Sequence, residues 1–125
     1  MTEEEKMFFA PRPEALPIYE ALRPMLLSAA EKAEIRTAKT QISFKDRYLY
    51  AAVSFTPVRR KAERPPVWLT LSLGLWYRPD SPRVAAASEP YPGRWTVHFL
   101  LGSAAEADEE LREWIGQAAF FAREK

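Results

Sequence analysis

The chain has 125 residues, of which 47% are hydrophobic and 13% aromatic, and this composition excludes intrinsic disorder as the default state. The formal net charge of +1 gives no overall attraction to nucleic acid or to an anionic membrane. The chain has no cysteine, which excludes disulfides, thiol catalysis and thiolate metal sites, and we expect a reducing, cytoplasmic location.

Residues 1–10 are acidic, and they predict a non-helical, partly flexible lead-in rather than a signal peptide. No apolar stretch approaches the roughly 20 residues that a membrane span requires, so we expect no membrane association. We find neither an internal repeat nor a second region with its own pattern. Residues 1–125 are therefore predicted to form a single domain.

A first helix is predicted from Pro13, because the N–H that proline lacks has no partner in an opening helical turn. Apolar residues then recur at helical spacing as far as Ala33. Pro24 falls inside this pattern and its ring would clash with the carbonyl of Glu20. We therefore expect a kink or a break at Pro24.

The period changes to two from Glu34 onward, which indicates strands. Ile42 and Phe44 alternate with polar residues, residues 45–47 form a turn, and residues 48–55 continue as a second strand. Three prolines and four basic residues follow, and they predict a loop over residues 56–66.

The clearest strand pattern runs from Val67 to Trp76, where aliphatic residues alternate with polar or aromatic ones. A register slip of one residue would send five aliphatic side chains to the wrong face, so the pattern fixes the strand's orientation. Residues 77–93 are predicted as a second proline-rich connection, with at most a short element at Arg83 and Val84. Residues 95–101 form the last predicted strand.

Gly102 ends that strand, and Ser103 followed by Glu106 has the spacing of a capping box that begins a C-terminal helix. Two helices flank the strands, and no crossover helix lies between them. This order predicts an α+β fold, with a largely antiparallel four- to five-stranded sheet and an N-terminal and a C-terminal helix packed on one face.

Three segments carry a family resemblance: residues 39–44 (KTQISF), 91–95 (YPGRW) and 111–115 (LREWI). They resemble a bacterial family known only as domain of unknown function 5655, over the chain from about Phe8 to its end. Members of that family occur alone or fused to other modules, and some are described as transport or nuclease-related proteins. The resemblance supports the fold and implies no mechanism, because the family offers no established site residues.

His98 is the only histidine, and a zinc site needs about four ligands from cysteine, histidine and carboxylate, so no metal site is expected. The four glycines are scattered and form neither a dinucleotide-binding fingerprint nor a phosphate-binding loop, so no cofactor is expected. His98 is thus the one candidate for a catalytic acid or base, although a lone histidine in a strand is more often structural.

If the leucines of residues 67–75 face the helices, the intervening side chains lie on the opposite face of the sheet. Polar groups interleaved with large aromatic rings suit a ligand groove or a partner surface. The alternative is that the tryptophans of this face pack beneath the two proline-rich loops. The predicted surface comprises Gln41, Ser43, Trp68, Thr70, Ser72, Trp76, Thr96 and His98.

The basic loop of residues 58–64 has four basic residues against one acidic residue, a local charge of +3. It would serve either as a phosphate-contacting finger or as a solvated loop that keeps a sheet edge soluble, and we favour the second. Nucleic acid is therefore not an expected partner. The candidates for contact with an anion are Lys39, Arg47, Arg59, Arg60, Lys61 and Arg94.

These patterns favour a non-enzymatic module that binds a ligand or another protein through the predicted surface. A homodimer or a protein partner is expected, and a small polar ligand is the other occupant that this surface suits. The alternative is a small enzyme for a polar or phosphorylated substrate, with His98 as acid or base and Lys39, Arg47 or Arg94 orienting an anionic group.

Overall fold

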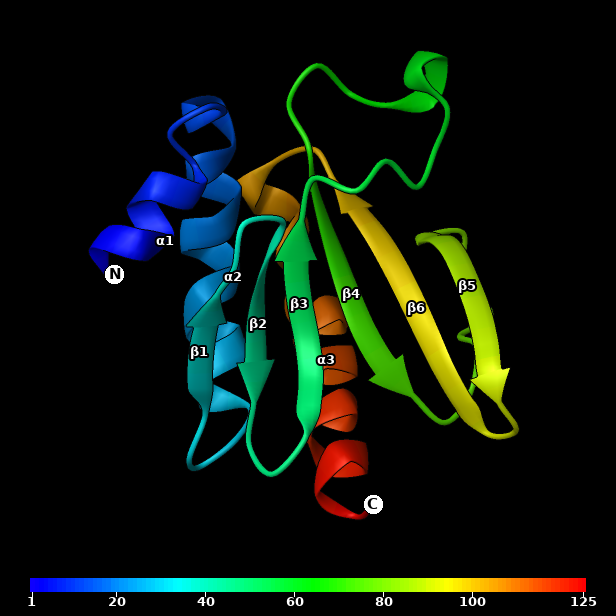
Figure 1. The fold of residues 1–125 in the computed structure, drawn as a ribbon. Coiled ribbons are helices and arrows are strands. Elements are labelled where there is room, and N and C mark those ends of the chain that lie inside the picture. The colour runs from blue at the N-terminus through cyan, green and yellow to red at the C-terminus, as the bar shows by residue number, and fades with distance from the viewer.

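Six strands form one antiparallel sheet in the computed structural model, which describes residues 1–125 (Figure 1). Their order across the sheet is β1-β2-β3-β4-β6-β5. The strands are β1 (Glu34–Thr37), β2 (Gln41–Lys45), β3 (Leu49–Ser54), β4 (Leu69–Leu75), β5 (Val84–Tyr91) and β6 (Arg94–Leu101). The predicted α+β class and antiparallel sheet are confirmed, with six strands in place of four or five.

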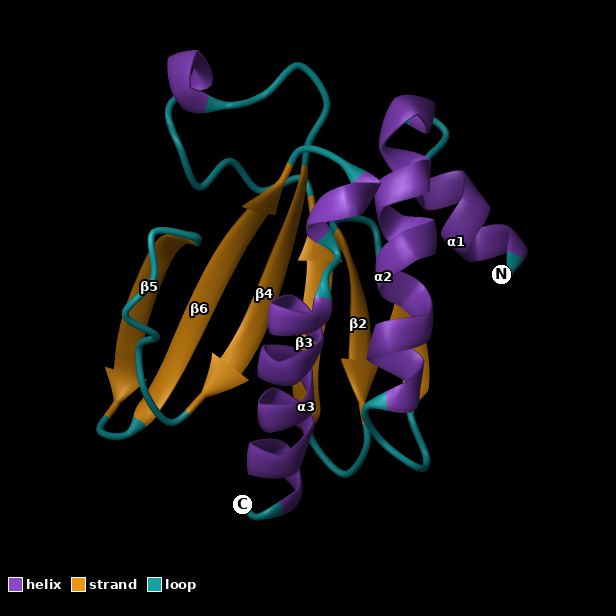
Figure 2. Ribbon diagram, turned by 180° about the vertical axis from the view of Figure 1, so that it is seen from behind, coloured by secondary structure: helices purple, strands orange, loops and turns teal.

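The helices leave one face of this sheet open (Figures 1 and 2). α2 (Leu16–Ser28) lies over β1 and β2, and α3 (Glu109–Arg123) packs on β3 and β4 of the same face. A short α1 (Glu3–Phe8) precedes them, and 3₁₀ turns occupy residues Pro13–Ala15, Lys61–Glu63 and Ala104–Glu106. None of the helices is long and apolar enough to cross a membrane.

The leucines of β4 face the helices, as their alternation predicted. Leu69, Leu71, Leu73 and Leu75 are at most 1% exposed and belong to the core. Between them, Ser72 lies opposite His98 of β6 in the strand register. Because strand side chains alternate between faces, Ser72 and His98 project from the open face.

A β-bulge changes the alternation at the start of β3. The pairing of Phe44 with Ala51 gives way to that of Lys45 with Leu49, so Tyr50 is an extra residue in the ladder. Its side chain turns inward and is fully buried, and its hydroxyl donates a hydrogen bond of 2.7 Å to the carbonyl of Leu26 in α2. Leu49 is left on the surface, with 48% of it exposed.

Residues 1–10 contain a helix where the sequence predicted a non-helical lead-in. Thr2 caps α1, because its hydroxyl accepts a hydrogen bond from the Glu5 N–H at 3.1 Å while Glu5 Oε1 accepts one from the Thr2 N–H at 2.8 Å. Thr2 and Glu5 have the spacing of a capping box, which marks the start of this helix. Glu5 is fully buried and contacts Tyr19 and Arg23 of α2, which fastens α1 to the domain.

Residues 77–93 contain β5, an eight-residue edge strand, where the sequence predicted a connection. The run Ala85–Ala87 lacks the large apolar side chains that marked the other strands, and Pro90 argued against a strand. An edge strand tolerates proline, since an N–H there can face solvent without a partner. β1 begins at Glu34, where the predicted period of two begins, and it forms the opposite edge of the sheet.

α3 begins at Glu109, several residues after the predicted capping box. Ser103 makes no capping hydrogen bond, and Glu106 belongs to a 3₁₀ turn in which its Oε1 accepts a hydrogen bond from the Gly102 N–H at 3.0 Å. The actual cap is Asp108, whose carboxylate accepts a hydrogen bond from the Leu111 N–H at 3.1 Å.

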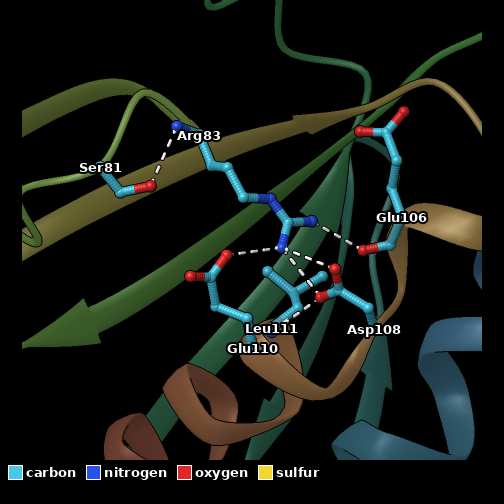
Figure 3. A network of polar contacts seen from close by, with 6 residues as sticks. All are labelled: Ser81, Arg83, Glu106, Asp108, Glu110 and Leu111. Carbon is cyan, nitrogen blue, oxygen red and sulfur yellow. Dashed lines mark hydrogen bonds and ion pairs between the residues drawn. The ribbon is translucent and has the colours of Figure 1, made fainter.

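Arg83 ties the start of β5 to the start of α3 (Figure 3). Its Nη1 lies 2.8 Å from Asp108 Oδ1 and 3.0 Å from Glu110 Oε1. Its Nη2 donates a hydrogen bond of 2.7 Å to the carbonyl of Glu106. One guanidinium thus holds the edge strand against the N-terminal end of the last helix.

α2 runs through Pro24 without a break, although a kink or a break was expected there. Pro24 and Glu20 are both exposed, so water can solvate the carbonyl that loses its hydrogen bond. Burial of Leu22 and Leu26 on the opposite side keeps the helix against the sheet.

Candidate functional site

The open face of the sheet holds a pocket of about 430 Å³. The proline-rich loops leave most of this face uncovered. Residues 56–66 extend beyond the ends of β3 and β4 and contact the face beside Trp68 and Thr70, and residues 77–83 pass on the helix side (Figures 1 and 2). Five polar side chains from four strands line the pocket: Gln41, Ser54, Ser72, Thr96 and His98.

Ser72 and His98 form a hydrogen-bonded pair in the floor of the pocket. The oxygen Oγ of Ser72 lies 2.7 Å from Nδ1 of His98, which follows from their opposed positions in β4 and β6. Burial lowers the pKa of His98 below its usual 6.5, so the imidazole is neutral at pH 7. Its Nε2 has no protein partner and is free to bind a ligand.

Small residues make the hollow beside this pair. Ala52 and Gly74 both line the pocket, and a Cβ atom added at Gly74 would meet nothing within 4 Å. Glycine inside a strand weakens it, and it often marks a place where another group approaches the backbone closely. The open volume over Gly74 is therefore suited to a bound molecule.

Two cationic side chains, Arg94 of β6 and Lys125 after α3, line the same pocket. Neither forms an ion pair. The pKa of Lys125 is lowered by its burial and by the positive charge of Arg94. No aspartate or glutamate side chain lines the pocket, so an anion would relieve the repulsion between these two cations.

Two residues of the predicted surface, Ser43 and Thr70, are buried in the sheet beside the pocket. Ser43 is 7% exposed and its Oγ accepts a hydrogen bond of 2.8 Å from Gln41 Nε2. Thr70 is fully buried, and its Oγ1 donates a hydrogen bond of 2.8 Å to the carbonyl of Thr56. These two hydrogen bonds hold neighbouring segments of the open face together.

The predicted tryptophans do not gather on this face. Trp68 precedes β4 and contacts Phe55 edge-to-face at a centroid distance of 6.1 Å. Trp76 follows the other end of β4 and packs on Phe121 of α3 at 5.7 Å. Trp68 and Trp76 lie apart because they flank opposite ends of one strand.

Only Arg94 among the six predicted anion contacts lines the open-face pocket. Arg47 lies in the β2–β3 turn over the ring of Tyr48. Arg59 donates to the carbonyl of Val84 at 3.4 Å, and Arg60 pairs with Glu63 at 3.3 Å. Lys39 and Lys61 line two other pockets.

Sequence reasoning missed several residues of the pocket. Ser54 and Ala52 share the outward phase of β3 and could have been found from that periodicity. Leu49 lies outward because of the bulge, and Lys125 reaches the pocket from the far end of α3. No local pattern marks these last two positions.

The site contains no obvious metal centre, since no three histidine, cysteine or carboxylate side chains stand close enough together to hold an ion. Comparison with curated proteins and with solved structures found no match. The family model described as "Domain of unknown function (DUF5655)" matches residues 4–120, which is nearly the whole chain. The chain therefore belongs to the DUF5655 family of domains of unknown function.

Proposed function

We propose that the chain is a non-enzymatic binding domain whose open-face pocket takes a small polar molecule with an anionic group. The pocket of about 430 Å³ is within the range of small-molecule sites. Arg94 and Lys125 supply the positive charge, and the polar side chains of the floor supply donors and acceptors for hydroxyl or amide groups.

The observation that carries this proposal is the Ser72–His98 pair beside the open volume at Gly74. The hydrogen bond to Ser72 holds the imidazole ring and leaves Nε2 without a protein partner. A polar group held in this way recognises its partner with little loss of conformational entropy. The unpaired cations of the same pocket add selectivity for a negative charge.

The alternative function is that of a small enzyme with His98 as acid or base. A position in a pocket and a neutral imidazole are compatible with that role. However, Nδ1 of His98 is already hydrogen-bonded to the hydroxyl of Ser72. No aspartate or glutamate side chain in the pocket orients Nε2. The β4 and β6 backbones are also paired along the ladder, and this leaves few N–H groups to stabilise an oxyanion. The site therefore supports binding better than catalysis.

The single histidine provides a direct test by nuclear magnetic resonance. The imidazole Hε1 signal belongs to His98 alone and can be followed while small hydroxycarboxylic acids, such as lactate, malate and citrate, are added to the protein. At least one compound is expected to shift this signal in a saturable manner. Arg94→Gln should weaken that binding about tenfold, because it removes a charge-assisted hydrogen bond.

Arg47→Gln is the matched control, since it removes the same charge from a turn that does not line the pocket. It should leave the affinity within about twofold of the unchanged protein. The proposal fails if no compound perturbs His98, or if the Arg47 and Arg94 variants weaken binding equally. Turnover of a bound compound that is lost in His98→Gln would instead establish the enzymatic alternative.

A further inference from the structure

A second pocket, of about 370 Å³, lies where the segment before α2 meets the end of the loop that precedes β4. Three cationic side chains line it, Arg12, Lys61 and Arg64, together with Trp68. Glu14 is the one acidic residue of its lining, so the charges of the pocket sum to +2. None of these residues forms an ion pair.

Arg64, which lines this pocket, has one side-chain atom without a hydrogen-bond partner. Its Nε is buried and makes no hydrogen bond, and it is the only buried side-chain nitrogen or oxygen atom of the chain in that condition. A buried donor without an acceptor destabilises the folded protein, and more so when it is charged. Because the protein encloses this Nε, Nη1 and Nη2 are the Arg64 donors left for a ligand.

Aromatic rings, rather than carboxylates, hold the two guanidinium groups in place. The Cζ of Arg12 lies 4.6 Å from the ring centroid of Phe55 and 5.3 Å from that of Trp68. The Cζ of Arg64 lies 5.2 Å from the centroid of Trp68. Cation–π contacts fix a guanidinium while leaving its charge uncompensated, so both groups keep their capacity for an anion.

We propose that this second pocket binds the phosphate group of a small phosphorylated molecule. A phosphate monoester carries a charge of about −1.5 to −2 at pH 7, which matches the sum of +2 in the pocket. Guanidinium groups bind phosphate oxygens in a bidentate manner, and Lys61 adds a point charge. Pro65 and Pro66, which also line the pocket, make a stiff wall for the rest of the ligand.

The arrangement favours a small ligand over a nucleic-acid strand. The other basic residues of the loop are engaged elsewhere, Arg59 with the carbonyl of Val84 and Arg60 with Glu63. Only Lys61 and Arg64 of this loop are therefore left for an anion, and the net charge of the chain is only +1.

This inference does not depend on the function proposed for the open-face pocket. The two pockets share no lining residue, and they lie toward opposite ends of β4. Either proposal can therefore fail while the other stands.

The test is isothermal titration calorimetry at 150 mM NaCl with inorganic phosphate and with ribose 5-phosphate as separate probes. At least one probe is expected to bind with one-to-one stoichiometry. Arg12→Gln and Arg64→Gln should each weaken binding at least tenfold. Arg64→Lys keeps the charge but loses the paired N–H donors of the guanidinium. Its affinity should lie between that of Arg64→Gln and that of the unchanged protein. Thermal unfolding of each variant verifies that it is folded.

Arg60→Gln is the matched control, since it removes one charge from the same loop outside the pocket, and it should alter affinity by less than twofold. Stronger binding of ribose 5-phosphate identifies an organic ester as the ligand, and equal binding identifies phosphate itself. The proposal is overturned if neither probe binds or if Arg60→Gln weakens binding as much as Arg64→Gln. It is also overturned if a single-stranded oligonucleotide binds more tightly than both probes.

Discussion

Glu5 shows how one buried carboxylate organises the first part of the chain. Its oxygens accept hydrogen bonds from the Thr2 N–H, from the hydroxyl of Tyr19 and from Arg23, whose Nε lies 2.7 Å from Oε2. Burial alone would raise the pKa of Glu5, but the hydrogen bonds and the charge of Arg23 outweigh it and lower that pKa from 4.5 to about 2. The carboxylate therefore stays ionised at every pH at which the protein would normally be handled.

This network predicts a specific loss of stability in acid. The folded-state pKa lies below that of the unfolded chain, so the contribution of Glu5 is full above about pH 5 and is lost as the pH falls toward 2. We expect this contribution to be roughly 1–3 kcal/mol, because Arg23 is partly exposed and water screens the pair. Urea unfolding of the unchanged protein and of Glu5→Gln, measured between pH 7 and pH 3, tests this contribution and its loss in acid.

In Glu5→Gln the free energy of unfolding should be lower at pH 7 and should depend less on pH in the acidic range. The exposed neighbour Glu4 offers a control, since Glu4→Gln removes a charge from the same helical turn. An equal flattening in both variants would show that general charge repulsion, rather than the buried network, governs the acid response.

At the scale of elements, the sequence was informative wherever a strong pattern coincided with burial on one side. The β4 leucines and the apolar face of α3 are cases of this kind, since a change of register or phase would expose many aliphatic groups. The same alternation placed Gln41, Ser72, Thr96 and His98 on the open face, where they line one pocket. This part of the site could be predicted because strand periodicity determines the face on which a side chain lies.

The missed elements lack such a pattern or depend on distant contacts. β5 consists largely of small and exposed residues and is held by its pairing with β6 and by Arg83. The second pocket joins Arg12 to Arg64, which no local spacing connects. The bulge turns Tyr50 inward, where its hydroxyl bonds to the carbonyl of Leu26 in a distant helix. Such features arise from tertiary structure, which a single sequence does not display.

The start of α3 offers a test that separates capping from charge. Asp108 caps the helix, and its carboxylate also pairs with Arg83, whose hydrogen bond together with that of the Leu111 N–H lowers the Asp108 pKa. Asparagine caps a helix about as well as aspartate, so Asp108→Asn should lose only the partly exposed ion pair. Its free energy of unfolding should fall by about 0–1 kcal/mol. Asp108→Ala should lose the cap as well, and its free energy of unfolding should fall by about 1–2 kcal/mol in total.

Chemical denaturation at pH 7 measures both Asp108 variants, and Glu110→Gln serves as a comparison that weakens the ion pair without touching the cap. Equal losses for the asparagine and alanine variants would mean that the ion pair to Arg83, and not the cap, stabilises this corner of the fold.

At the scale of the whole molecule, the two pockets proposed as binding sites lie on one sheet face and at one end of the sheet. The core fills the space between the sheet and the helices, and the helix-free face carries polar groups and small residues. The sheet edges resist pairing with other chains, since β1 has only four residues and β5 contains Pro90. A partner of any size would therefore approach the open face more readily than an edge.

The predicted homodimer can be tested on that face. Leu49 and Tyr91 line the open-face pocket and are 48% and 68% exposed, so a second copy docked there would bury both and close the pocket. A dimer on this face would be the alternative to the small ligand proposed for the pocket. In analytical ultracentrifugation over a dilution series, such a dimer would dissociate on dilution, and Tyr91→Ser should weaken its association at least tenfold. Phe120→Ser, which replaces a side chain of α3 that is 60% exposed, should have little effect, because α3 lies on the other face. A strict monomer at every concentration contradicts the dimer, and it would leave the pocket accessible to a small ligand.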